Sequence, residues 1–303
     1  MMATQNRFRG CLLGLACGDA VGTTVEFKAR GTFEPVTDMV GGGPFKLKAG
    51  QWTDDTSLAL CLATSLVEKD GFDSMDQMER YCRWHREGYL SSNGECFDIG
   101  NTTASALHEF EATGEPYAGS TDSWAAGNGS IMRLAPVPIF FFPDREQVIH
   151  YSGESSRTTH GSEECVGACR LLGEMLFLAL SGAPRDEILF ATKTARDLSP
   201  KVQEIADGAY RDKDESDIEG SGYVIKSLEA ALWCFLHTDT FRDAILRAVN
   251  LGEDTDTTAA VSGQIAGAFY GEHGIPDEWL SRLAMAAEIR ELADQSQRGL
   301  AVE

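Results

Sequence analysis

Apolar residues recur at three- and four-residue spacing along most of the chain, and this periodicity restricts the fold more than any other feature. Such spacing puts apolar side chains on one face of an α-helix, whereas the two-residue alternation of a half-buried strand is scarce. Helices are predicted around residues 8–17, 58–67, 75–84, 166–180, 223–236, 241–249, 259–269 and 279–289. Glycine-rich connectors separate these segments at residues 40–44, 91–94, 114–129 and 220–222.

None of these connectors is long or polar enough to be a convincing interdomain linker. The chain has 303 residues, 43% of them hydrophobic, which is enough to bury a sizeable core in one large domain or two small ones. We therefore expect an all-α fold in which residues 1–303 form a single compact domain, and we expect a monomer.

The cysteines and the N-terminus indicate a reducing compartment. Eight cysteines lie mostly inside apolar helical patterns, and no two form a C-x-x-C pair, so we expect reduced thiols rather than disulfides. Residues 1–9 contain no apolar signal core, and no apolar run reaches the roughly 18 residues that a membrane span needs. These features predict a cytoplasmic protein without a membrane span.

The charge balance excludes two classes of partner. The chain carries 47 acidic and 26 basic residues, which gives a net charge of −21. Such a surface argues against binding nucleic acid through a basic face and against docking on an anionic membrane. An anionic substrate would need local positive charge, which bound cations could supply.

Two acidic clusters, at residues 53–56 and 253–258, each precede an apolar helical pattern. Acidic residues at a helix start can be there simply to cap the helix. This simpler interpretation is sufficient for either cluster taken alone. Brought together, four aspartates would repel one another unless divalent cations lay among them. Hard oxygen ligands suit Mg²⁺ or Mn²⁺, and ions about 3.5–4 Å apart are the usual arrangement for so many carboxylates.

Several short motifs together resemble those of the ADP-ribosylglycohydrolase family, and especially its bacterial dinitrogenase reductase-activating members. The motifs follow the family's order over roughly residues 7 to 270: Gly18-Asp19-Ala20-Val21-Gly22, Val25-Glu26-Phe27, Gly50-Gln51-Trp52-Thr53-Asp54-Asp55-Thr56, Asp98-Ile99-Gly100-Asn101-Thr102-Thr103, Gly127-Asn128-Gly129-Ser130-Ile131-Met132-Arg133, Thr159-His160 and Gly252-Glu253-Asp254-Thr255-Asp256-Thr257-Thr258. The resemblance implies an orthogonal all-helical fold with a two-metal centre.

The resemblance also assigns ligands to the two divalent cations. It implies the six ligands Thr53, Asp54, Asp55, Asp254, Asp256 and Thr257. Adjacent aspartates diverge by about 100° on a regular helix, and aspartates two apart share a side only on extended or turning backbone. We therefore expect both clusters at junctions rather than inside helices.

Glu26 and Asp98 are the candidates for proton chemistry. Taken alone, Glu26 would be a surface glutamate and Asp98 a helix cap. The resemblance brings Glu26 to the metal centre as a base for an attacking water or as a movable gate. It brings Asp98 to the scissile ribose, where a carboxylate could stabilise positive charge at C1″ or handle a proton. The choice of base between them stays open.

Further residues are predicted to contact the substrate. The glycine-rich run at residues 127–130, leading into a helix start, suits a pyrophosphate, although a simple tight turn is the alternative. Arg133 could pair with phosphate or with a structural carboxylate. His160, preceded by Thr159 as a helix cap, would hydrogen-bond near the phosphates or ribose, and Tyr223 would stack on the adenosine. The predicted substrate contacts are Asn101, Gly127, Asn128, Gly129, Ser130, Met132, His160 and Tyr223.

The resemblance implies hydrolysis of the bond between ADP-ribose C1″ and a modified protein side chain, with arginine favoured as the acceptor. Serine-linked ADP-ribose, poly(ADP-ribose) and O-acetyl-ADP-ribose are alternative substrates. Two other classes are also compatible with the sequence: a non-catalytic ADP-ribose-binding or crystallin-like protein, and a phosphoesterase that cuts the pyrophosphate. The acidic clusters count against a purely structural role, since such a role gives no reason to keep four repelling carboxylates.

Overall fold

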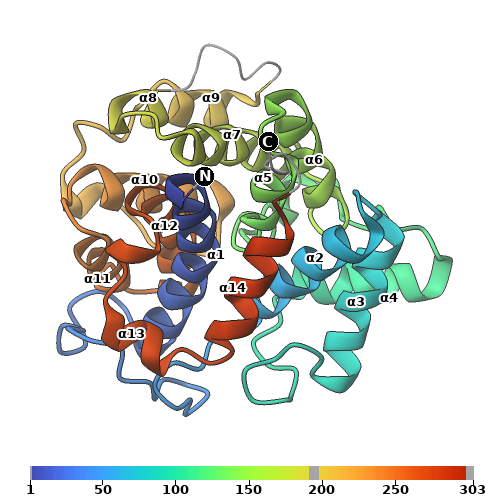
Figure 1. The fold of residues 1–303 in the computed structure, drawn as a ribbon, viewed down its shortest axis with the longest axis horizontal. Coiled ribbons are helices and arrows are strands. Elements are labelled where there is room, and N and C mark those ends of the chain that lie inside the picture. The colour runs from blue at the N-terminus through green and yellow to red at the C-terminus, as the bar shows by residue number, and fades with distance from the viewer. Residues whose placement is uncertain (1, 191–197, 298–303) are drawn as a thin grey trace.

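The computed structural model describes residues 2–190 and 198–297, and within these ranges it contains fourteen α-helices and no β-strand (Figure 1). The α-helices are α1 Met2–Gly22, α2 Asp54–Lys69, α3 Ser74–Glu87, α4 Asn101–Thr113, α5 Pro136–Phe141, α6 Arg145–Arg157, α7 Glu163–Ser181, α8 Arg185–Leu189, α9 Pro200–Ala206, α10 Val224–Leu236, α11 Phe241–Val249, α12 Thr255–Tyr270, α13 Asp277–Arg282 and α14 Ala286–Gln295. Short 3-10 helices are η1 Thr23–Val25, η2 Ser123–Ala125, η3 Glu215–Asp217 and η4 Glu272–Gly274. The all-α prediction is confirmed.

Seven of the predicted helical segments each correspond to a single helix, and one prediction was wrong. Residues 279–289 form no continuous helix, because the chain breaks between α13 and α14 at Met285, whose φ of 53° is left-handed. Five helices were missed: α4, α5, α6, α8 and α9. Three of these have only five to seven residues, which is too short for a helical period to show, and α6 is largely polar.

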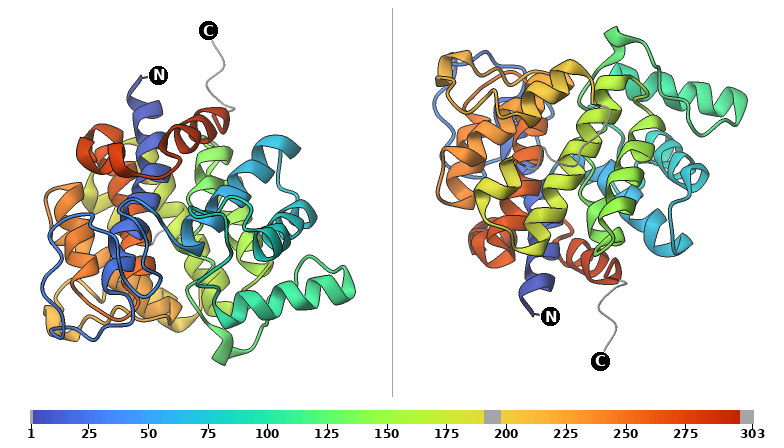
Figure 2. Two further views of the ribbon diagram at one scale, coloured as in Figure 1. Left: turned by 90° about the horizontal axis from the view of Figure 1, so that it is seen from below. Right: turned by 90° about the horizontal axis from the view of Figure 1, so that it is seen from above.

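Helices α1 and α12 form the centre of the molecule, and the other helices pack around them (Figures 1 and 2). Helices α7, α10 and α11 contact α12, and α14 lies against both α1 and α2. The main apolar core surrounds α1 and α12, and a smaller apolar cluster lies among α2, α3 and α4. All eight cysteines are free, and seven of them are buried, as predicted. Among the described helices, none is long and apolar enough to cross a bilayer.

The contact between α1 and α12 depends on glycines. Gly10, Gly14, Gly18 and Gly22 recur every four residues and form one stripe on α1. A Cβ atom added at Gly14 would overlap the carbonyl oxygen of Gly263, and one added at Gly18 would overlap that of Ala259. The two backbones are therefore nearly in contact and run antiparallel. No larger residue fits this seam without moving a helix.

The close contact between α1 and α12 positions the site, because each helix carries an aspartate near the end of this contact. Asp19 follows Gly18 on α1, and Asp256 lies in the first turn of α12. A Cβ atom at Gly22 would meet the Asp256 backbone, so no side chain separates the two helix ends. The hydroxyl of Thr255 also donates a 2.7 Å hydrogen bond to the Gly22 carbonyl oxygen.

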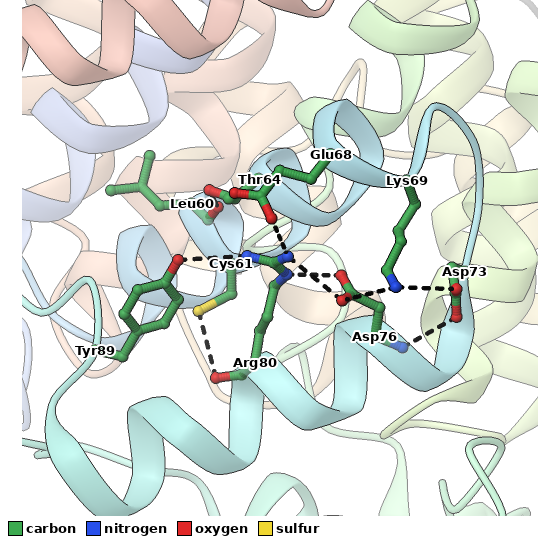
Figure 3. A network of polar contacts seen from close by, with 9 residues as sticks. All are labelled: Leu60, Cys61, Thr64, Glu68, Lys69, Asp73, Asp76, Arg80 and Tyr89. Atoms are coloured by element: carbon green, nitrogen blue, oxygen red, sulfur yellow. Dashed lines mark hydrogen bonds and ion pairs between the residues drawn. The ribbon is translucent and has the colours of Figure 1, made fainter.

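A polar network holds α2 against α3 at the end of α2 away from the site (Figure 3). The Arg80 guanidinium donates 2.6 Å hydrogen bonds to Asp76 on its own helix and to Glu68 on α2. Lys69 of α2 lies 3.5 Å from Asp76, and Asp73 caps α3 by accepting from the Asp76 amide. Since Arg80 and Asp76 are largely shielded from solvent, the network fixes the direction of α2 more firmly than exposed pairs would.

Candidate metal and substrate site

A cavity of about 410 Å³ opens where the N-terminal ends of α2, α4 and α12 converge. Its remaining walls come from the connection after η1 and from the turn at residues 127–129. The lining residues are Glu26, Phe27, Asp54, Asp55, Asp98, Ile99, Gly100, Asn101, Thr102, Thr103, Gly127, Asn128, Gly129, Met132, His160, Gly222, Asp254, Asp256 and Thr257. Both acidic clusters lie at helix starts, so the expectation that they occupy junctions is confirmed.

Six carboxylates and no lysine or arginine line the described walls of this cavity. One oxygen from each of Glu26, Asp98 and Asp256 lies within 4.8 Å of the other two, which is the separation that a shared cation would span. Asp55 and Asp256 are almost fully buried, and Asp98 is half-buried. The cavity therefore concentrates negative charge on side chains that are largely removed from bulk solvent.

Asp19 supports the first acidic cluster from behind. Its carboxylate accepts hydrogen bonds from the amide and hydroxyl of Thr53 (2.9 and 3.0 Å) and from those of Thr56 (3.0 and 2.6 Å). Thr53 occupies the N-cap position of α2, but its own side chain caps no amide. A carboxylate from α1 thus does the capping, and this leaves Asp54 and Asp55 free to face the cavity.

Neighbouring polar groups orient three of the other aspartates. The Thr257 hydroxyl lies 3.3 Å from Asp55, and the Thr53 hydroxyl lies 3.2 Å from Asp256. The side-chain amide nitrogen of Asn128 donates a 2.8 Å hydrogen bond to Asp254. These contacts hold one oxygen of each carboxylate, and the other oxygen of Asp55 and of Asp256 has no partner among the described residues.

Burial and mutual repulsion change the acidities in the cavity. Burial, together with the charges of Asp98 and other nearby aspartates, raises the pKa of Glu26 to about 10. Burial also raises the pKa of Asp98, to about 7, and that of Asp19, to about 6. The pKa values of Asp54, Asp55 and Asp256 are raised by burial and then by the carboxylates around them. The charged forms are unfavourable without a compensating cation.

The donor set fits divalent cations. Three buried carboxylate oxygens, Oε2 of Glu26, Oδ2 of Asp55 and Oδ1 of Asp256, have no hydrogen-bond donor within the part of the chain that the structure describes. A buried charged oxygen without a partner is costly, and a hard cation is the partner that carboxylates in such a cluster accept. The residues therefore suit Mg²⁺ or Mn²⁺, and the choice between these ions depends on their availability.

This electrostatic arrangement predicts how stability depends on pH and metal. The raised pKa values mean that the metal-free protein gains stability from protonated carboxylates below about pH 4 and loses it as pH rises through the folded pKa values of Asp98 and Glu26. In EDTA, we expect the melting temperature to fall between about pH 5 and pH 9. Added Mg²⁺ or Mn²⁺ should raise it, and by more at pH 8 than at pH 5.

Differential scanning fluorimetry across this pH range is the measurement. The salt-bridged Asp38, whose pKa is lowered to about 2 by hydrogen bonds from Arg282 and Trp279, titrates below this window and does not obscure the trend. Asp98→Asn is the matched variant, because removing one titrating group should flatten the slope in EDTA. A metal-induced shift of equal size at every pH would contradict this account of the carboxylates.

Strained backbone surrounds the carboxylates. Phe27, Asp98 and Glu253 are non-glycine residues with left-handed φ values of 64°, 64° and 65°. Asp98 is itself a carboxylate of the cavity, and Phe27 and Glu253 are each next in sequence to one. Backbone strain of this kind is concentrated at functional sites. The Phe27 amide donates to the Glu253 carbonyl oxygen at 2.8 Å, and the Glu253 amide donates to that of Lys28 at 2.7 Å. These paired bonds fix the backbone beside Glu26 and Asp254.

The glycine-rich turn lies against His160. A Cβ atom added at Gly129 would stand 2.7 Å from the His160 ring, so only glycine permits this approach. Burial, and then the charge of Arg133, lowers the pKa of His160 to about 3, which keeps its ring neutral. Within the described residues, the amide groups of Gly129 and Ser130 have no acceptor.

Arg133 reaches neither a carboxylate nor the cavity, so both predicted pairings were wrong. It is fully buried, and its guanidinium donates to the Gly129 carbonyl oxygen at 2.7 Å and to the hydroxyl of Thr159 at 2.8 Å. The Arg133 guanidinium thus fixes the glycine turn and the Thr159–His160 pair. The turn does not lead into a helix, because residues 131–133 continue as turns and α5 begins only at Pro136.

Two further capping interpretations were wrong. The N-cap of α7 is Ser162, which accepts from the Cys165 amide, rather than Thr159. Gly100 rather than Asp98 occupies the N-cap position of α4. Asp98 is therefore not needed to cap that helix, and its carboxylate is turned to the cavity.

Three predicted residues do not line the cavity: Thr53, Ser130 and Tyr223. The Thr53 hydroxyl lies within hydrogen-bond distance of Asp19 and Asp256. The Ser130 side chain is buried within reach of the Cys169 thiol. The Tyr223 hydroxyl donates to Glu164 at 2.7 Å and accepts from Lys201 at 2.7 Å.

Several residues of the site had no predicted role. Asp19 supports the first acidic cluster, and the lining also includes Phe27, Ile99, Gly100, Thr102, Thr103 and Gly222. Asp19 could have been found because it closely follows the apolar helical pattern at residues 8–17, and an aspartate buried there must have partners. No sequence pattern indicated a role for Gly222. It lies at the cavity because its carbonyl oxygen accepts a 3.0 Å hydrogen bond from the backbone amide of Asn128.

The helical fold and the acidic cavity together define a helical protein with a buried site suited to divalent cations. The chain belongs to the ADP-ribosylglycohydrolase family, whose model matches residues 1–302.

Two related proteins and a solved structure are similar to nearly the whole chain. The chain is 47% identical to the "ADP-ribosylarginine hydrolase Tri1" of Pseudomonas putida (strain GB-1), over 96% of this chain and 77% of that protein. It is 32% identical to the "ADP-ribosyl-[dinitrogen reductase] glycohydrolase" of Rhodospirillum rubrum, over 97% and 95% of the two chains. A solved structure described as an "ADP-ribosylglycohydrolase-related protein complex" matches with a TM-score of 0.88 and 42% identity, over 98% and 99% of the two chains.

Proposed function

We propose that this protein hydrolyses the N-glycosidic bond of ADP-ribosyl-arginine in a modified protein and releases ADP-ribose, with two divalent cations in the acidic cavity. The observation that carries the proposal is the group of three carboxylates, Glu26, Asp98 and Asp256, beside a glycine turn. Among the described residues, one buried oxygen of Glu26 and one of Asp256 have no hydrogen-bond partner. The similarity to an ADP-ribosylarginine hydrolase favours arginine as the acceptor. A carboxylate-lined cavity is also suited to a cationic guanidinium.

In this proposal five of the six predicted ligands line the cavity and would hold the cations: Asp54, Asp55, Asp254, Asp256 and Thr257. Bound cations would supply the positive charge that the cavity lacks and would favour deprotonation of water. The sixth predicted ligand, Thr53, does not line the cavity, and its hydroxyl would instead orient the carboxylates of Asp19 and Asp256. Asn128 then acts mainly by orienting Asp254.

The pyrophosphate would lie against the glycine turn. The free amide groups of Gly129 and Ser130 are suitable donors to an anion, so Ser130 would act through its backbone rather than its hydroxyl. The Thr159 hydroxyl accepts from Arg133 and so can donate to Nδ1 of His160, 2.8 Å away. The neutral imidazole would then carry its proton on Nε2 and could donate to a phosphate oxygen.

The proton chemistry belongs to Glu26 and Asp98. Both face the cavity beside Asp256, and either can take a proton from the attacking water once cations offset the local charge. The other carboxylate would stabilise positive charge that develops at C1″. The scissile C1″–N bond breaks, the ribose gains the water oxygen, and the arginine nitrogen leaves with a proton. Asn101 and Met132, which line the cavity, would contact the ribose or the phosphates.

Product analysis after incubation with Mn²⁺ or Mg²⁺ tests the proposal. Arginine-, serine- and acetyl-linked ADP-ribose are offered in parallel, and we expect free ADP-ribose chiefly from the arginine-linked substrate. AMP with ribose phosphate would instead support a phosphoesterase, and absence of any product from every substrate would support a binding protein.

A further inference from the structure

A second, more apolar groove joins the acidic cavity. It has a volume of about 320 Å³ and lies between α4 and the connection that carries η2. Asn101 and Thr102 line both hollows, so the two adjoin at the start of α4. Helix α4 contributes Ala106 and Glu109 to one wall, and Trp124 stands on the other.

The Trp124 indole is unusually open to solvent. It is 84% exposed, although tryptophan is the largest apolar side chain, and no described residue stacks on it. Its neighbour Ala125 is buried, and the Ala125 amide donates to the Asp122 carbonyl oxygen at 3.0 Å. An exposed aromatic ring of this size beside a pocket is typical of a contact surface.

The connection around Trp124 is attached to the rest of the fold at both of its ends. The Gly119 amide donates to the Arg157 carbonyl oxygen, and the Gly161 amide donates to that of Ser120, at 3.1 and 3.0 Å. At the other end, the Val224 amide donates to the Ala126 carbonyl oxygen at 3.0 Å. The indole is therefore presented by fixed backbone, which reduces the entropy lost when a partner covers it.

We propose that this groove binds the polypeptide segment that flanks the modified arginine of the protein substrate, with an apolar side chain packed on Trp124. The proposal rests on the proposed function, because the segment leaves the acidic cavity through the shared wall at Asn101 and Thr102. Glu109 is the charged residue of the groove, and the chain has a net charge of −21, so the segment that fits is cationic as well as apolar. Tryptophan is the residue type most enriched at such binding hot spots.

A nucleobase is the less favoured occupant of this groove. Small-molecule sites usually enclose most of their ligand, whereas a base on this open indole would keep one face in water. The described wall also offers a carboxylate and no basic group to the adjoining phosphates. A polypeptide can cover the indole and continue across the surface.

Steady-state kinetics of Trp124→Ala on two substrates test the proposal. One substrate is a short peptide in which ADP-ribosyl-arginine is flanked by leucine and lysine, and the other is free ADP-ribosyl-arginine. We expect KM for the peptide to rise about tenfold, with kcat and the KM for the free substrate unchanged within about twofold. Val40→Ala, which removes an exposed apolar side chain outside both hollows, should leave all values unchanged.

Reversal of charge gives an independent arm. Glu109→Lys should raise KM for the lysine-flanked peptide about threefold and should lower it for a glutamate-flanked peptide. If Trp124→Ala raised KM equally for the peptide and for free ADP-ribosyl-arginine, the proposal would be overturned in favour of nucleotide binding. If it changed KM for neither substrate, the proposal would be overturned outright.

Failure of the proposed function would be distinguishable from failure of this inference. If the wild-type protein cleaved neither substrate, hydrolysis would be refuted. The affinities of the modified peptide and of ADP-ribose, measured with Mn²⁺ present by fluorescence anisotropy and calorimetry, would still decide the docking question. We expect Trp124→Ala to weaken binding of the peptide about tenfold and to leave the affinity for ADP-ribose unchanged.

Discussion

Replacing Asp54 and Asp55 together by alanine should lower the hydrolysis of ADP-ribosyl-arginine by at least about a thousandfold. Both carboxylates lie in the first turn of α2 and face the acidic cavity, and Asp55 has an oxygen without a donor. Their loss would remove two of the proposed cation ligands, and the charge of Glu26, Asp98 and Asp256 would then no longer be offset. The measurement is the rate of ADP-ribose release at saturating Mn²⁺.

The stability of this variant separates a lost site from a lost fold. In EDTA, the double variant should melt at the same temperature as the wild type or higher, because two buried carboxylates that repel their neighbours have been removed. Added Mn²⁺ should no longer raise its melting temperature. Asp212→Ala removes an exposed carboxylate and should change neither activity nor metal response. Full turnover by the folded double variant would contradict the assignment of these residues.

The substitution Gly14→Ala should lower the free energy of unfolding by about 3 kcal/mol, despite the higher helix propensity of alanine. The added methyl group would overlap the backbone of Gly263, so α1 and α12 must separate. Gly14 lies one turn before Gly18, and the displacement would reach Asp19 and its hydrogen bonds to the first acidic cluster. Activity should therefore fall together with stability.

Urea denaturation followed by circular dichroism measures this effect. Gly71→Ala is the matched control, because no atom lies within 4 Å of its added Cβ and its φ is not left-handed. That variant should differ from the wild type by less than about 0.5 kcal/mol. If Gly14→Ala unfolded at the same urea concentration as Gly71→Ala, the close approach of α1 and α12 would not be what holds the centre of the fold.

Much of the fold was predictable because its long helices have a clear apolar period. Helices α7, α10 and α12 each bury a broad apolar face, which the three- and four-residue spacing reveals. The break at Met285 was not predictable, because its left-handed conformation involves neither glycine nor proline. The glycine stripe on α1 was visible in the sequence, but it reveals a close helix contact only when its partner is known.

The site was predictable where the residue types of a short motif indicate the ligand that the motif binds. The two acidic clusters and the glycine-rich turn converge on one cavity, as expected for motifs with a shared ligand. The role of Arg133 was not predictable, because a buried arginine can be satisfied by carbonyl and hydroxyl oxygens as well as by carboxylates. Nor could sequence place Trp124, since its exposure depends on how the connection around it is anchored.

The most direct test of the central claim is identification of the product that the protein makes from ADP-ribosyl-arginine in the presence of Mn²⁺. Chromatography with mass detection should find free ADP-ribose and unmodified arginine in equal amounts, and EDTA should abolish their formation. Cleavage of the pyrophosphate to AMP, or release of ADP-ribose at an undiminished rate in EDTA, would contradict a metal-dependent glycohydrolase.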